Sequence, residues 1–113
     1  MVIVDPAGKK DKPEIRDLEL TLINSHWPKC DQIAETIRKI GGKDATNALI
    51  SGLKGKRHHV RSAAIRSLTK IGDKSLAAFI EPYLNDPSYE VRMDAKQAIK
   101  SLTGQDVKTG RGE

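Results

Sequence analysis

Aromatic residues and cysteine are both scarce in this chain of 113 residues. Aromatic side chains make up only 4% of the sequence, so any core must be built from Leu, Ile, Val and Ala. A single cysteine, Cys30, excludes an internal disulfide framework and fits a reducing, cytoplasmic location. No apolar run approaches the ~20 residues of a membrane-spanning helix, and the first residues lack the basic and apolar segments of a signal peptide. We therefore expect a cytoplasmic protein with no membrane partner.

Charge is plentiful, with a modest excess of one sign. The 20 basic and 15 acidic residues give a formal net charge of +5. Such a balance permits an acidic partner, such as a nucleic acid, but does not require one. Composition therefore leaves the kind of partner open.

An internal repeat of 31 residues organises the sequence. When the sequence is aligned with itself at an offset of 31 residues, Val60-Arg61 matches Val91-Arg92, and Lys39-Ile40-Gly41 matches Lys70-Ile71-Gly72. Each period holds two stretches whose apolar residues recur every three or four positions, as they do along one face of an α-helix. Self-similarity of this length is typical of helical repeat proteins, in which neighbouring units stack.

The predicted fold class is all-α, an α-solenoid of about three helix pairs. Pro82 lies inside the fifth helix and should kink it or delay its start, because proline lacks a backbone donor. Asp86 is expected to cap the sixth helix, with Pro87 at its first position. The six helices are expected at residues 13–25, 29–41, 44–54, 58–71, 74–84 and 88–103. The first of these is the second helix of a pair without its partner, and the last is the first helix of a pair without its partner.

The domain organisation follows from these helices. Residues 13–103 would form one repeat domain. A Gly/Lys-rich lead-in over residues 1–12 and a polar, glycine-containing tail over 104–113 are both expected to be flexible.

Short motifs mark equivalent places in successive periods. Val-Arg-x-x-Ala opens two of the first helices as Val60–Ala64 and Val91–Ala95, Ile71-Gly72-Asp73 forms a turn, and Asp86-Pro87 precedes the last helix. With these motifs the chain resembles HEAT-like repeat proteins over residues 13–103, and more narrowly the short HEAT-like repeats of the phycobilisome-lyase type. The resemblance implies that the second helices of the pairs line a concave face on which partners bind. It also implies that the two motif arginines, at 61 and 92, are structural and bond to Asp or carbonyl groups of adjacent repeats.

Six outward positions on the second helices form the predicted protein-binding surface. Their charges are mixed, and Ile50 is expected to be an exposed aliphatic residue among polar neighbours. Mixed polarity suits a protein ligand better than a phosphate backbone, which favours a run of Lys and Arg. The six residues are Arg16, Glu19, Thr46, Asn47, Ile50 and Glu81.

A basic cluster with no acidic member is the alternative site. It lies in the link before the fourth expected helix and in that helix's first turn, where free backbone N–H groups could add to the binding of phosphate. A solvated link between repeats is the other interpretation of the same residues. The cluster consists of Lys54, Lys56, Arg57, His58, His59 and Arg61.

No catalytic, cofactor or metal site is expected. His58 and His59 are adjacent, and neighbouring helical positions point about 100° apart, with no Cys or carboxylate at ligand spacing nearby. Cys30 could be a nucleophile at a helix start, but a half-buried structural thiol is the favoured interpretation. Trp27 fits either the packing of a corner or an anchor for a partner.

Three classes of function remain. The favoured one is a non-catalytic interaction module, or scaffold, that binds a protein through the concave face. The alternative is nucleic-acid binding through the basic cluster, and a weaker one is chromophore handling of the phycobilin-lyase kind, which depends on the resemblance alone. Self-association is a further possibility, because both end helices lack a partner from their own pair and leave the ends of the solenoid uncapped.

Overall fold

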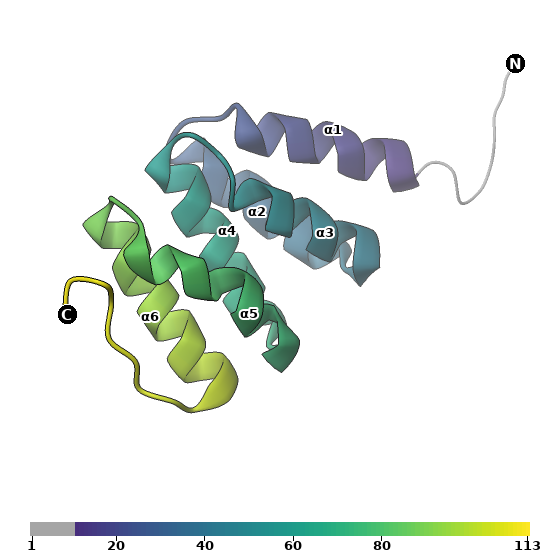
Figure 1. Ribbon diagram of the computed structural model, residues 1–113. Coiled ribbons are helices and arrows are strands. Elements are labelled where there is room, and N and C mark those ends of the chain that lie inside the picture. The colour runs from purple at the N-terminus through teal and green to yellow at the C-terminus, as the bar shows by residue number, and fades with distance from the viewer. Residues whose placement is uncertain (1–10) are drawn as a thin grey trace, which may run out of the picture.

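The computed structural model describes residues 11–113, which contain six α-helices and no strand (Figure 1). The expected all-α solenoid architecture is thereby confirmed. None of the helices in this range is long and apolar enough to cross a membrane. The helices are α1 (Asp11–Ile23), α2 (Lys29–Ile40), α3 (Gly42–Gly52), α4 (His58–Ile71), α5 (Ala77–Ile80) and α6 (Tyr89–Thr103), and two 3₁₀ segments, η2 (Lys74–Leu76) and η3 (Glu81–Asn85), flank α5.

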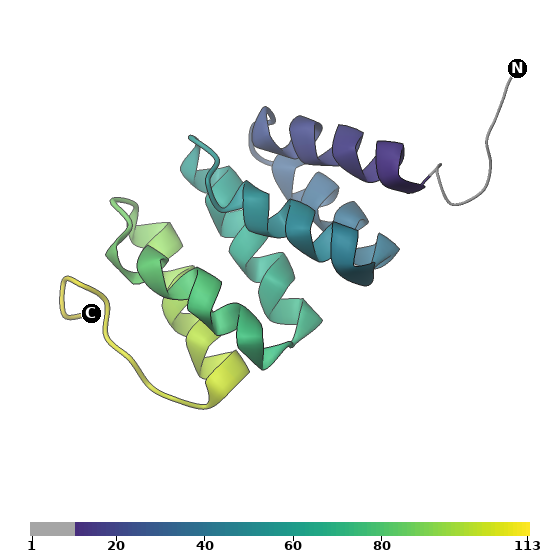
Figure 2. The same cartoon turned by 45° about the vertical axis from the view of Figure 1, so that its right-hand side comes forward.

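The helices form two layers (Figure 2). Helices α2, α4 and α6 lie in one layer, and α1, α3 and α5 lie in the other. Helix α4 is central, since it packs against α2, α3 and α6. Each helix pair therefore buries its apolar faces against the next pair, as stacked repeats do.

The core between the layers is aliphatic, as the composition predicts. On α4, Val60, Ala64 and Leu68 recur every four residues and are fully buried. They meet a similar face on α6 that includes Val91 and Ala95. Burial of a side chain the size of Leu stabilises the fold by roughly 1.5–3 kcal/mol, so the repeating apolar face supplies the main stabilising term.

The fifth expected helix, residues 74–84, is broken up in the structure. Only Ala77–Ile80 is α-helical, and 3₁₀ segments replace the turns on both sides. Pro82 lies in the first turn of η3, where its missing N–H leaves no α-helical bond unmade. The expected kink is thus a change of helix type that starts one residue before the proline.

The start of α6 corrects one expectation. Asp86 is not the N-cap; that position belongs to Ser88, whose Oγ accepts from the backbone N–H of Val91 at 3.4 Å. The Asp86 carboxylate instead accepts from the N–H of Ser88 at 2.9 Å and closes the turn that precedes the helix. Its remaining acceptor capacity is used by Arg61, which binds it across the repeat boundary.

The C-terminal segment after α6, residues 104–113, makes contacts with the repeat domain. It turns back along α6 toward the start of that helix (Figure 1, yellow). The N–H of Gly110 donates to Leu84 O at 3.0 Å, and the Glu113 carboxylate accepts from Arg92 at 2.8 and 3.1 Å. The physical reason is that the Arg92 side chain is almost fully buried and requires an acidic partner, which this segment supplies. The expected flexible lead-in, 1–12, falls almost wholly outside the described residues.

This arrangement makes the stability of the fold depend on acid pH. Hydrogen bonds from Arg92 and Thr109, with the charge of Arg92, lower the pKa of Glu113 to about 2. A carboxyl whose pKa is lower in the folded state stabilises the fold above its unfolded pKa, about 4.3, and loses that effect as the pH falls toward 2. We expect Glu113→Gln to be less stable than the wild type at pH 6, with the difference shrinking between pH 4.5 and 2.5.

Urea unfolding of both proteins across this pH range measures that difference. The same substitution at the exposed Glu81 is the matched control and should leave stability unchanged at every pH. A difference for Glu113→Gln that stays constant with pH would show that the contact with Arg92 does not stabilise the fold through charge.

Candidate functional site

A shallow groove between α1 and α3 brings together three of the predicted binding residues. Arg16 and Glu19 come from α1, and Asn47 comes from α3. The groove has a volume of about 240 Å³. Its full lining is Ile15, Arg16, Glu19, Asp44, Asn47, Ala48 and Ser51.

The chemistry of this α1–α3 groove is mixed. Ile15 and Ala48 are buried and form an apolar floor, because they also belong to the core. The rim carries one basic group, two carboxylates and an amide, so it offers donors and acceptors of both charges. Such a surface matches the polar rim and apolar centre of a protein interface, and it lacks the run of cations that a phosphate backbone favours.

The other residues predicted for this surface lie differently. Ile50 is half-buried and packs against the core, which corrects the expectation of an exposed aliphatic side chain. Thr46 is half-buried too, and its hydroxyl donates to Gly42 O at 3.1 Å, within its own helix. Glu81 lines a separate hollow of about 110 Å³ against α6 and the C-terminal segment. The predicted row is therefore divided, and only Arg16, Glu19 and Asn47 line one groove.

Arg61, in the basic cluster, is structural. Its Nε and one terminal nitrogen donate to the Asp86 carboxylate at 2.8 and 2.9 Å. The other terminal nitrogen donates to Gly55 O at 3.1 Å and to Lys56 O at 2.8 Å. All parts of this guanidinium are thus used inside the protein, which confirms the predicted structural role and removes Arg61 from a ligand-binding surface.

Arg92 repeats these bonds at the equivalent positions of the next repeat. One terminal nitrogen donates to Asp86 O at 2.9 Å and to Pro87 O at 3.0 Å, the fifth and sixth residues before it, as with Arg61. Glu113 takes the place that Asp86 has opposite Arg61. The C-terminal segment therefore supplies Arg92 with a carboxylate, as the start of the next repeat supplies Arg61 with Asp86.

The remaining members of the basic cluster separate into two groups. Lys54, Lys56 and Arg57 are exposed in the link between α3 and α4. His58 and His59 instead face Glu90 on α6, and each Nε2 lies 3.8 Å from its Oε1. Only three cations of the predicted cluster are thus presented to solvent without an acidic neighbour in this part of the structure.

A charged ladder crosses the other layer of helices. Arg66 on α4 donates to Asp31 on α2 at 2.6 Å and to Asp94 on α6 at 2.9 Å, so it joins three successive repeats. Burial raises the pKa of the Asp94 carboxyl, although Arg66 acts in the opposite direction. The sequence alone does not relate Arg66 to Asp94, because no local pattern connects residues that meet only through the stacking of repeats.

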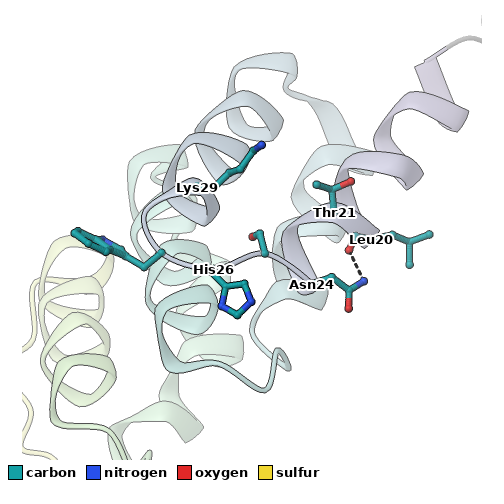
Figure 3. Close-up of a pocket in the computed structure, with 7 residues that line it drawn as sticks. Leu20, Thr21, Asn24, His26 and Lys29 are labelled. Carbon is teal, nitrogen blue, oxygen red and sulfur yellow. Dashed lines mark hydrogen bonds between the residues drawn. The ribbon is translucent and has the colours of Figure 1, made fainter.

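A second hollow lies where α1 ends and the chain turns into α2 (Figure 3). Its volume is about 570 Å³, and its lining comprises Leu20, Thr21, Asn24, Ser25, His26, Trp27 and Lys29. Leu20 and Trp27 are 53% and 59% exposed. The exposure of Trp27 favours the contact-anchor interpretation over corner packing.

Cys30 is fully buried in α2, and that burial raises the pKa of its thiol. A nucleophilic cysteine needs the opposite, an accessible sulfur with a lowered pKa. The structure therefore supports the structural interpretation of Cys30.

Comparison with known proteins gives one finding. A family model described as HEAT repeats matches residues 21–100. No curated protein and no solved structure matched the chain. The match confirms the resemblance to HEAT-like repeats, while the narrower phycobilisome-lyase type stays a prediction.

Proposed function

This chain belongs to the HEAT-repeat family, and from that premise we propose that it is a non-catalytic interaction module that binds a protein partner through the α1–α3 groove. HEAT repeats generally are protein-interaction scaffolds. Stacked helix pairs provide extended surfaces without any catalytic apparatus. The proposed setting is the cytoplasm, in keeping with the single buried thiol.

The mixed lining of the groove is the observation that carries this proposal. Arg16, Glu19, Asp44 and Asn47 surround a floor of buried aliphatic side chains. A protein segment can place an apolar side chain on that floor and exchange hydrogen bonds with the rim. A nucleic-acid backbone would bring its phosphates against Glu19 and Asp44, which is unfavourable.

Nucleic-acid binding through Lys54, Lys56 and Arg57 is the second candidate. These three exposed cations precede α4, and no side chain in the described part of the chain caps its N-terminus. Three phosphate contacts would make affinity fall roughly 40-fold between 50 and 200 mM salt. The weaker alternative, chromophore handling, depends on the resemblance to lyase-type repeats alone.

Paired variants distinguish the two sites. We expect the double variant Glu19→Lys, Asn47→Arg to weaken binding of a partner recovered with the wild-type chain by at least tenfold. The first change reverses a charge on the rim of the groove, and the second places a larger, charged side chain there. Lys56→Glu with Arg57→Glu should leave that affinity within about twofold. Gln97→Arg, on the exposed part of α6, is the matched control for added positive charge.

Calorimetry with the purified partner measures these affinities, and circular dichroism checks that each variant is folded. A gel shift with random duplex at the two salt concentrations runs in parallel. Loss of partner binding only in the Lys56/Arg57 variant, or duplex binding with the salt dependence above, would overturn the protein-groove proposal in favour of the basic link.

A further inference from the structure

Two histidines and a carboxylate from different repeats converge at one edge of the solenoid. His58 and His59 open α4, and Glu90 lies in the first turn of α6. Each histidine Nε2 lies 3.8 Å from the same oxygen, Oε1 of Glu90. The three ligand atoms all lie within 4.8 Å of one another. No carboxylate lies at ligand spacing from the histidines along the sequence, but the packing of α6 beside α4 brings Glu90 next to them.

The rings of His58 and His59 lie close together, although they come from adjacent positions of a helix. Successive helical side chains leave the axis about 100° apart, which would separate the two rings. His58, however, is the first residue of its helix, and the ring centroids of the pair lie 4.0 Å apart with an interplanar angle of 37°. Both rings therefore lean over the same side of α4, toward α6.

The contacts across the repeat boundary hold this arrangement in place. Arg61 binds the Asp86 carboxylate, which closes the turn leading into α6. That bridge fixes the first turn of α4 beside the first turn of α6, where the three side chains lie. The cluster is thus a product of the stacking and not of a flexible loop.

We propose that His58, His59 and Glu90 form a surface site for a divalent transition-metal ion of the zinc class. Imidazole nitrogen and carboxylate oxygen are ligands that Zn²⁺ accepts, in sets of three protein ligands with one open position for water. Bonds of about 2.0–2.2 Å in tetrahedral geometry place ligand atoms about 3.4 Å apart. The observed separations, 3.8 Å from each histidine to Glu90 and no more than 4.8 Å within the set, require the partly exposed side chains to close in by up to about 1.4 Å.

The neighbouring charges set the strength of the site. The Arg66 guanidinium lies 3.7 Å from Oε2 of Glu90, whereas both histidines lie near Oε1, and Arg66 is itself held by Asp31 and Asp94. It therefore leaves Oε1 for the ion. The positive end of the α4 dipole opposes a cation, so we expect micromolar and not nanomolar affinity. A bound ion would link the first turns of two successive repeats.

Trp27 provides a direct reporter of the site. It is the only tryptophan of the sequence, and its ring centroid lies 5.8 Å from that of His59. Cu²⁺ quenches nearby indole fluorescence and takes the same ligands more tightly than Zn²⁺ does. Titration of the metal-free full chain with Cu²⁺ should quench Trp27 at one equivalent, and excess Zn²⁺ or EDTA should restore the emission.

Calorimetry with Zn²⁺ on the full chain and three variants tests the ligand set. We expect one ion per chain, and at least a tenfold loss of affinity in each of His58→Ala, His59→Ala and Glu90→Gln. His26→Ala, which removes the one remaining histidine, is the matched control and should bind as the wild type does. All substituted side chains are at least partly exposed, and circular dichroism verifies the folds.

Each other outcome overturns the proposal. Absence of stoichiometric Zn²⁺ binding at 100 µM free ion would mean that the cluster is an ordinary charged contact. Unchanged affinity in Glu90→Gln would mean that the histidine pair binds ions without the bridge between repeats. Loss of binding in His26→Ala would place the ion at the hollow near the end of α1.

Discussion

Replacement of Leu68 by alanine should lower the free energy of unfolding by about 2–4 kcal/mol. Leu68 is fully buried on α4, the helix that packs against α2, α3 and α6. Removal of its side-chain carbons loses transfer free energy and leaves a cavity between rigid helices that cannot all move inward. The change therefore affects several interfaces at once.

Urea unfolding followed by helical circular dichroism measures this effect. Leu20→Ala is the matched control, because the same carbons are removed from a leucine that is 53% exposed on α1. We expect that control to change stability by less than about 0.5 kcal/mol. Equal effects of the two substitutions would show that the apolar face of α4 does not form the centre of the core.

The helix boundaries could be predicted because they depend on local patterns. The expected fourth helix, 58–71, agrees with α4 at both ends, since its apolar face, its preceding link and Gly72 all lie within one repeat. Gly72 adopts φ 80° at the C-cap, the left-handed conformation that a glycine after a helix predicts. Pro82 likewise predicted that the fifth helix would be irregular. Only the structure shows that the irregularity is a 3₁₀ segment.

The contacts of the C-terminal segment could not be predicted, because they depend on a tertiary partner. Residues 104–113 are polar and contain glycines, which on their own indicate mobility. Their contacts centre on Arg92, which binds Glu113 much as Arg61 binds Asp86 one repeat earlier. Only the packed position of Arg92 reveals this pairing.

The candidate sites show the same division between local and tertiary information. The polar faces of α1 and α3 could be placed side by side from the repeat, and Arg16, Glu19 and Asn47 do share a groove. Ile50 was expected to be exposed, but it is half-buried and packs against the core, a contact that depends on the neighbouring elements and not on the polar residues beside it in the sequence. The contact of Glu90 with His58 and His59 could not be predicted from the sequence, because the two histidines belong to the preceding repeat.

The second large effect is expected at Asp86, where alanine should cost about 3 kcal/mol of stability. The Asp86 side chain is only 4% exposed and that of Arg61 is 15% exposed. Burial alone would raise the pKa of the Asp86 carboxyl, but hydrogen bonds from Arg61 and the Ser88 N–H, with the charges of Arg61 and Arg92, hold it below its usual value. The group is thus an ion at neutral pH, and its removal leaves a largely buried guanidinium without a counter-charge.

Three variants separate the ion pair from the turn that Asp86 also closes. Asp86→Asn keeps an oxygen that can accept from the Ser88 N–H but removes the charge, so its loss of stability reports the pair with Arg61. Asp86→Ala loses both contacts and should be the less stable of the two. Asp106→Ala is the matched control, since that carboxylate is 84% exposed and its pair with Lys100 should contribute less than about 1 kcal/mol. Urea unfolding at neutral pH measures all three. If Asp86→Asn is as stable as the wild type while Asp86→Ala is not, the turn and not the bridge between repeats holds α6 in place.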